Sequence, residues 1–160
     1  MCGNNCDCCC EEENKKTVHA QLSSDVSQHN GPMSVGFPIT FNHHDSIHDI
    51  GHLIGSSEVH ITKEGLYFVL AAPQTGSITE NSFTSDYWMK VNGVNVPNSN
   101  VQLVSLTHET KDVIVTQGLL SLKEGDVLQI YGSGINSQSE AIIVNNEPVI
   151  PSIIFTMYKV

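Results

Sequence analysis

The chain has 160 residues with 39% hydrophobic content, which is enough for one domain with a real core and a short extension. All seven basic residues are lysines, and 17 acidic residues bring the formal net charge to −10. Nucleic-acid binding needs clustered Lys and Arg, so we expect no nucleic-acid partner. No apolar run approaches the roughly 20 residues that cross a membrane, and the first residues lack the order of a signal peptide, so we expect no membrane association.

Residues 1–34 have the composition of a flexible, cysteine-rich tail with few large apolar side chains. The spacing does not form the paired Cys-x2-Cys units of a zinc site. Three interpretations stay open: the thiols cross-link the chain to neighbouring proteins, they hold a soft metal as a loose thiolate cluster, or they have no defined role. All five cysteines of the chain lie in this segment: Cys2, Cys6, Cys8, Cys9 and Cys10.

Residues 35–160 read as a domain of short strands. Asn92-Gly93 lies between two apolar arms, which is a strong hairpin signal because both residues tolerate positive φ. A His-rich loop is expected at 42–57 and a Gly/Ser/Asn-rich loop at 132–147. The spacing of turn signals predicts an all-β sandwich or jelly roll without helices. The expected strands cover 35–41, 58–62, 66–72, 86–96, 101–108, 113–122, 127–131 and 149–159.

Three segments in this order resemble the C1q and tumour necrosis factor superfamily, specifically the C1q-like globular head. They are Gly65-Leu-Tyr-Phe-Val, Leu122-Lys-Glu-Gly-Asp-Val-Leu-Gln-Ile and Pro151-Ser-Ile-Ile-Phe-Thr-Met-Tyr-Lys. The final segment is most similar to the heads of spore-surface proteins in bacilli. The resemblance implies a ten-stranded jelly-roll β-sandwich that assembles into a compact homotrimer.

Aromatic residues are expected to divide between the core and the trimer interface, because alternation along a strand must turn some of them outward. The candidates are Tyr67, Trp88, Tyr131, Phe155 and Tyr158.

Four histidines, His43, His44, His48 and His52, are the candidate ligands for zinc or nickel. A spacing of four would stack three of them if the loop were helical, and in a trimer one per chain could meet at the axis. The alternatives are a polar loop whose histidines bond to backbone or water, and a pH-sensitive interface. For calcium, the candidate carboxylates are Asp45, Asp49, Asp86 and Asp112.

No catalytic motif is present in the sequence: there is no His-x-His of a cupin, no Gly-x-Ser-x-Gly elbow and no phosphate-binding Gly-Lys loop. With no catalytic motif, the resemblance implies a non-enzymatic, homotrimeric structural or adhesive module of the spore coat or exosporium, whose tail cysteines attach it to other spore-surface proteins. One alternative is a trimer that binds a carbohydrate or a receptor through the 73–86 or 132–147 loops. Another is a metal-binding protein that uses the His-rich loop.

Overall fold

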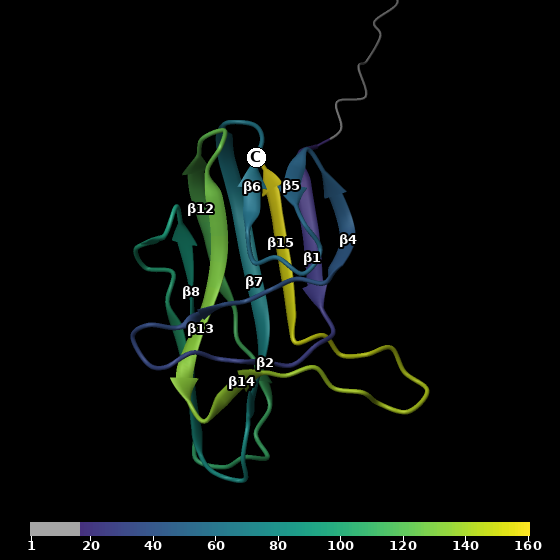
Figure 1. Cartoon of the computed structure of the whole chain (residues 1–160), viewed down its shortest axis with the longest axis vertical. Coiled ribbons are helices and arrows are strands. Elements are labelled where there is room, and N and C mark those ends of the chain that lie inside the picture. The colour runs from purple at the N-terminus through teal and green to yellow at the C-terminus, as the bar shows by residue number, and fades with distance from the viewer. Residues whose placement is uncertain (1–16) are drawn as a thin grey trace, which may run out of the picture.

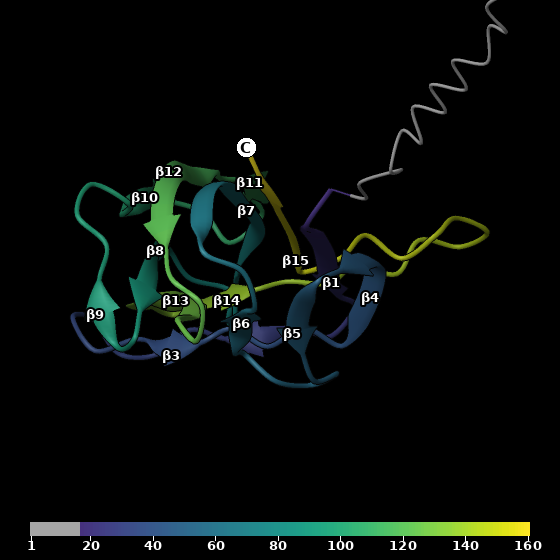
Figure 2. The same ribbon diagram turned by 90° about the horizontal axis from the view of Figure 1, so that it is seen from above.

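The computed structural model describes residues 17–160, and in this part of the chain fifteen strands form two sheets without a helix. Every strand pair is antiparallel. Figure 1 shows β12, β7, β15, β1 and β4 side by side, and Figure 2 shows the two layers from above. Both sheets are long enough to bury one face against the other, which is the condition for a sandwich.

The larger sheet has eight strands with β7 (Gly65–Ser77) near its middle. On one side of β7 follow β15 (Ile153–Lys159), β1 (His19–Ser24) and β4 (His43–His48), and on its other side lies β12 (Thr116–Leu122). The far end of β7 also pairs with β11 (Asp112–Val113) and β14 (Ser137–Ser139), and β14 pairs with β2 (Gln28–His29).

The smaller sheet has seven strands in the order β10 (Val101–Ser105), β8 (Phe83–Val91), β13 (Val127–Ile135), β6 (Val59–Ile61) and β5 (Ile50–His52). Two short strands complete it: β3 (Phe37–Pro38) pairs with β13, and β9 (Val94–Asn95) pairs with β8. Ten strands of the two sheets make the expected jelly roll, and β2, β3, β9, β11 and β14 are short additions to it.

The core lies between the sheets and follows the period-two alternation of the strands. In the first half of β7, Tyr67, Val69 and Ala71 are buried, and in the adjacent β15 Phe155 and Met157 are fully buried. The residues between them point to the opposite face of the sheet. One face of the larger sheet therefore builds the core, and the other remains open.

The Asn92-Gly93 hairpin is confirmed. Asn92 and Gly93 have φ values of 50° and 78°, as a turn with two positive φ angles requires. The turn joins β8 to β9, and the backbone N–H of Val96 donates to the carbonyl oxygen of Met89 at 2.9 Å.

The expected domain boundary at residue 34 is wrong, because residues 19–24 form β1 inside the larger sheet. β1 pairs with β15 on one side and β4 on the other, and Ala20 and Leu22 lie in the core. Ala20 and Leu22 are the two apolar residues of this strand, and polar residues alternate with them. The composition of the whole segment therefore hid the alternation that identifies a strand.

The prediction of a loop at 42–57 is wrong in part, because β4 and β5 lie inside this range. β4 is polar because it is an edge strand, and four of its six residues are exposed. The expected strand at 35–41 is also shorter than predicted, since only Phe37 and Pro38 pair with β13. Hydrophobic patterns identify edge strands poorly, because such strands bury little surface.

The connection from β1 to β4 crosses the width of the sandwich and returns (Figure 1). Polar side chains join the two arms of this connection to each other and fix it to the body. Gln28 Oε1 accepts hydrogen bonds from Thr40 N at 2.8 Å and Thr40 Oγ1 at 2.9 Å, and Asn30 Nδ2 donates to the buried hydroxyl of Tyr87 at 2.9 Å. This connection forms one wall of a pocket on the smaller sheet.

Candidate functional site

The open face of the larger sheet carries a row of large side chains across five strands. In register, Leu119 of β12 lies beside Phe68 of β7, which lies beside Tyr158 of β15, followed by His19 of β1 and His48 of β4. The Phe68 and Tyr158 rings are 5.3 Å apart, and the His19 and His48 rings are 6.2 Å apart. One half of this face carries mostly apolar side chains, with Gln117, Ser121 and Thr156 among them, and the other half carries imidazoles.

The apolar half extends over β7, β12 and β15, and we name it the apolar face. No charged residue occupies the outward positions of these three strands. Exposed apolar surface of this extent, uninterrupted by charge, is typical of an interface. Its residues are Leu66, Phe68, Leu70, Ala72, Leu119, Ile154 and Tyr158.

The four candidate metal-binding histidines lie in three separate places. His43 Nε2 lies 2.9 Å from the Asp25 carboxylate, and His48 Nε2 lies 3.6 Å from that of Asp49. The helical stacking that a spacing of four would allow does not occur, because these residues belong to strands. Within residues 17–160 no group of three or more His, Cys, Asp or Glu side chains is placed to hold a metal ion.

His44 and His52 form a contact pair at the edge where the two sheets meet. His44 Nε2 lies 2.8 Å from His52 Nδ1, and His52 Nε2 lies 3.1 Å from the carbonyl oxygen of Ser56. The His52 ring also packs edge-on against Phe41 at 5.8 Å. Burial lowers the pKa of His52, and positive charge on His44 or His60 lowers that pKa further.

The candidate calcium carboxylates are also apart from one another. Asp45 accepts a hydrogen bond from Ser23 Oγ at 3.1 Å, and Asp49 pairs with Lys63. Asp112 is exposed in β11, whereas Asp86 is buried on the smaller sheet. Their positions on different strands explain why the sequence could not group them.

The five candidate aromatic residues occupy three environments. Tyr67 and Phe155 are fully buried in the core, and Tyr158 lies on the apolar face. Trp88 and Tyr131 pack together on the outer side of the smaller sheet at 5.7 Å, and the Lys90 ammonium lies 3.9 Å from the Tyr131 ring centroid. Burial raises the pKa of Tyr67, whose hydroxyl donates to the carbonyl oxygen of Lys63 at 2.6 Å.

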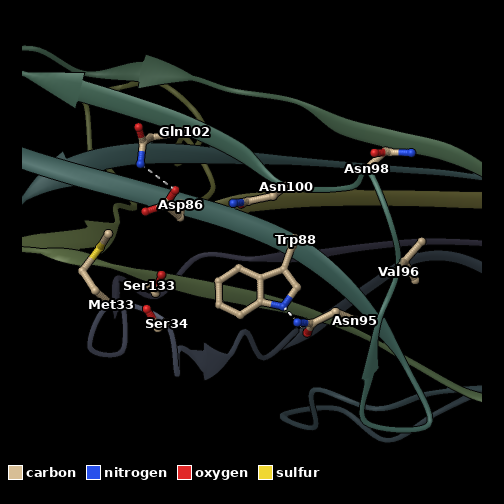
Figure 3. A pocket seen from close by; sticks show the side chains of 10 residues that line it. All are labelled: Met33, Ser34, Asp86, Trp88, Asn95, Val96, Asn98, Asn100, Gln102 and Ser133. Carbon is tan, nitrogen blue, oxygen red and sulfur yellow. Dashed lines mark hydrogen bonds between the residues drawn. The ribbon is translucent and has the colours of Figure 1, made fainter.

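A pocket on the smaller sheet was not predicted from the sequence. Figure 3 shows its lining, with the carboxylate of Asp86 and the indole of Trp88 at its base. Both residues point to the same side of β8 because they are two positions apart. The Asp-x-Trp spacing in a predicted strand could have suggested this, but the chain segments that close the pocket come from distant parts of the sequence.

The five cysteines lie outside the described residues, so their predicted role in cross-linking stays a prediction. Among residues 17–160, no helix has the length and apolar content needed to cross a membrane.

No protein-family model matches the chain, and no curated protein sequence does so either. Solved structures with a similar fold include the globular domain of the zebrafish complement 1qA protein. The two share 13% sequence identity at a TM-score of 0.58, and the match covers 91% of this chain and 98% of that chain. Identity this low establishes the fold alone, and the prediction of a C1q-like jelly roll is confirmed.

Proposed function

We propose that this chain is a non-enzymatic C1q-like module that forms a homotrimer through the apolar face. The observation that supports the proposal is the continuous row of Leu119, Phe68 and Tyr158 on the open side of the larger sheet. Leu119 is 61% exposed and Tyr158 is 42% exposed, which is unusual for neighbouring large apolar side chains on a single chain. C1q-like domains commonly form trimers, and three copies would cover such a face.

The net charge of the chain is consistent with an interface at the uncharged apolar face. Each chain carries a formal net charge of −10, so identical chains repel one another at long range. An interface without charged side chains avoids adding close like-charge pairs to that repulsion. Burial of large apolar side chains then provides the attraction, at about 1.5–3 kcal/mol for each side chain that becomes fully buried.

A matched pair of substitutions tests the proposal. Leu119→Asp places a carboxylate in the middle of the apolar face. Leu53→Asp makes the same change at a residue that is 77% exposed beyond β5, on a loop away from this face. We expect light scattering at about 20 µM to give a trimer for the parent chain and Leu53→Asp, and a monomer for Leu119→Asp. A monomeric parent chain, or a trimer that Leu119→Asp leaves intact, would overturn the proposal.

The location and attachment of the module form a second part of the proposal. The resemblance of the C-terminal segment to spore-surface heads supports a place in the spore coat or exosporium, with Cys2, Cys6, Cys8, Cys9 and Cys10 as attachment points. In this proposal, full-length protein forms reductant-sensitive species larger than a trimer, and a variant with these cysteines replaced by serine does not. Identical behaviour of the two proteins without reductant would contradict a cross-linking role.

Divalent metal binding at the histidines is retained as a separate prediction. Elemental analysis of protein purified without a His tag tests it, and zinc or nickel at one ion per three chains is the result expected for a site at a threefold axis. Protein without zinc, nickel or calcium after dialysis against each ion in turn would dispose of this alternative.

A further inference from the structure

A pocket of about 400 Å³ lies on the outer side of the smaller sheet (Figure 3), and Asn95 and Val96 of its wall also line a second hollow together with Leu119 of the apolar face. Its base is formed by the β8 residues Asp86 and Trp88. One wall is the loop of residues 95–100 that follows β9, and the other is the turn of residues 31–36. The volume is in the range of a small-molecule site.

Asp86 is the residue that gives the pocket its chemistry. Its side chain is 5% exposed, and Oδ1 accepts a hydrogen bond from Gln102 Nε2 at 2.9 Å. The second oxygen, Oδ2, is buried and has no hydrogen-bond partner among the described residues. A buried carboxylate oxygen without a partner is unfavourable, so Oδ2 calls for a hydrogen-bond donor from outside the described residues. A ligand that donates a hydrogen bond to Oδ2 would satisfy it.

The loop wall is held in place before any ligand arrives. Ser99 is buried, and its Oγ accepts a hydrogen bond from Met89 N at 3.0 Å and donates to the Val96 carbonyl oxygen at 2.8 Å. Thr116 Oγ1 of the opposite sheet donates to the Ser99 carbonyl oxygen at 2.6 Å. Asn98, with φ of 60°, lies at the rim of this fixed loop.

The turn wall is equally constrained. Gly31 N donates to the Gly132 carbonyl oxygen at 3.0 Å, and Gly134 N donates to the Gly31 carbonyl oxygen at 2.9 Å, so the turn is bonded to β13. Gly36 has φ of 69°, and a Cβ there would lie 2.5 Å from Trp88 Cη2. The turn therefore packs directly on the indole. A preformed pocket binds without an ordering penalty for its walls.

Four amide side chains line the pocket together with the carboxylate: Asn95, Asn98, Asn100 and Gln102. Each amide can both donate and accept hydrogen bonds. The Trp88 indole N–H already donates to Asn95 Oδ1 at 2.9 Å, which leaves the Asn95 amide nitrogen as a donor beside the pocket. A ligand that matches this lining must donate to one carboxylate and exchange hydrogen bonds in both directions with the amides.

We propose that this pocket binds a neutral polyhydroxylated ligand of pyranose size, as a free sugar or as the terminal residue of a glycan. Vicinal hydroxyls donate to Asp86 Oδ2 and exchange hydrogen bonds with the amides, and carbons of the ring contact the apolar atoms of Trp88 and Met33. An anion is disfavoured by Asp86. A simple cation would leave the amide donors unmatched, and the ammonium of Lys90 already covers the neighbouring Tyr131 ring.

The test uses Trp88 as an internal reporter, because it is the only tryptophan of the chain. Full-length protein is titrated with D-glucose, D-galactose, D-mannose or N-acetyl-D-glucosamine while Trp88 emission is followed, and saturation-transfer NMR is recorded on the same samples. We expect at least one of these sugars to bind with a Kd of about 1–10 mM, as expected for a ligand of about twelve heavy atoms. L-Lysine serves as the cationic probe.

Two pocket variants and one control complete the experiment. Asp86→Asn keeps the shape but turns the free acceptor into an amide, and Asn98→Gly removes one rim amide while allowing the positive φ. We expect each to weaken sugar binding at least tenfold, whereas Asp112→Asn on the exposed β11 leaves the affinity unchanged. Absence of binding by all four sugars, equal affinity of the Asp86→Asn protein, or binding of L-lysine alone would overturn the proposal.

Discussion

Gly36 offers a direct test of the contact between the 31–36 turn and Trp88. Its φ is 69°, and an added Cβ would lie 2.5 Å from Trp88 Cη2 and 3.1 Å from the Gly132 carbonyl oxygen. Gly93 has a similar φ of 78°, but an added Cβ there meets nothing within 4 Å. Gly36→Ala and Gly93→Ala therefore share the backbone strain and differ in the steric clash.

The magnitudes follow from these two contributions. An alanine at positive φ costs about 1–2 kcal/mol, which is partly offset by about 0.4–1 kcal/mol from the reduced entropy of the unfolded chain. We therefore expect Gly93→Ala to lower the free energy of unfolding by about 1 kcal/mol. Overpacking against Trp88 adds about 1–3 kcal/mol, so Gly36→Ala should lose about 2–4 kcal/mol.

Urea unfolding measures this difference, with Trp88 emission and circular dichroism followed at one fixed protein concentration. The fixed concentration matters because self-association makes the midpoint concentration-dependent. We also expect the native emission of Trp88 to change in Gly36→Ala and to stay unchanged in Gly93→Ala. Equal losses of stability in the two variants would show that the turn does not pack on the indole, and the pocket wall described above would then be wrong.

Three further predictions concern buried and titrating groups. Tyr87→Phe removes a core hydroxyl that accepts two hydrogen bonds, so we expect a loss of about 2 kcal/mol in urea unfolding, against little change for the half-buried Tyr131→Phe. The pKa of His52 is lower in the folded chain than its unfolded value of about 6.5. The stability that His52 contributes is therefore present above about pH 6.5 and is lost as the pH falls through the folded pKa. Thermal unfolding between pH 8 and pH 5 should show this loss, and His52→Gln should reduce the slope; an unchanged slope would refute it. The pKa of Asp126 is lowered by hydrogen bonds from the backbone N–H of Lys123 and the amide of Asn92, so Asp126→Asn should remove stability above about pH 4 and have less effect below the folded pKa. Equal effects of Asp126→Asn at pH 7 and pH 2.5 would contradict this assignment.

The strands that could be predicted are those with a strong local signal. Asn92-Gly93 specifies its turn through φ alone, and β7 is apolar on both faces because one face builds the core and the other belongs to the apolar face. β1 was missed because its alternating polar residues resembled the tail before it, and its place in the sheet is provided by partners more than 20 residues away. Local composition does not reveal such long-range pairing.

The candidate sites were harder to predict for the same reason. The sequence placed Tyr158 and Trp88 on strands, but only the register across β12, β7 and β15 shows which aromatic side chains share the open face. The histidines are close in sequence, yet His43 and His48 lie at opposite ends of β4 beside different carboxylates, and only His44 and His52 come into contact. Likewise, the pocket around Asp86 depends on two segments, 31–36 and 95–100, whose positions follow from the whole topology.

The most direct test of the central claim is the mass of the assembled protein in solution, by size-exclusion chromatography with light scattering in the presence of reductant. We expect a species of three times the 17.4 kDa chain mass, which Leu119→Asp converts to single chains and Leu53→Asp leaves intact. A parent protein of 17.4 kDa at tens of micromolar would contradict the claim that the apolar face is an interface between copies of this chain.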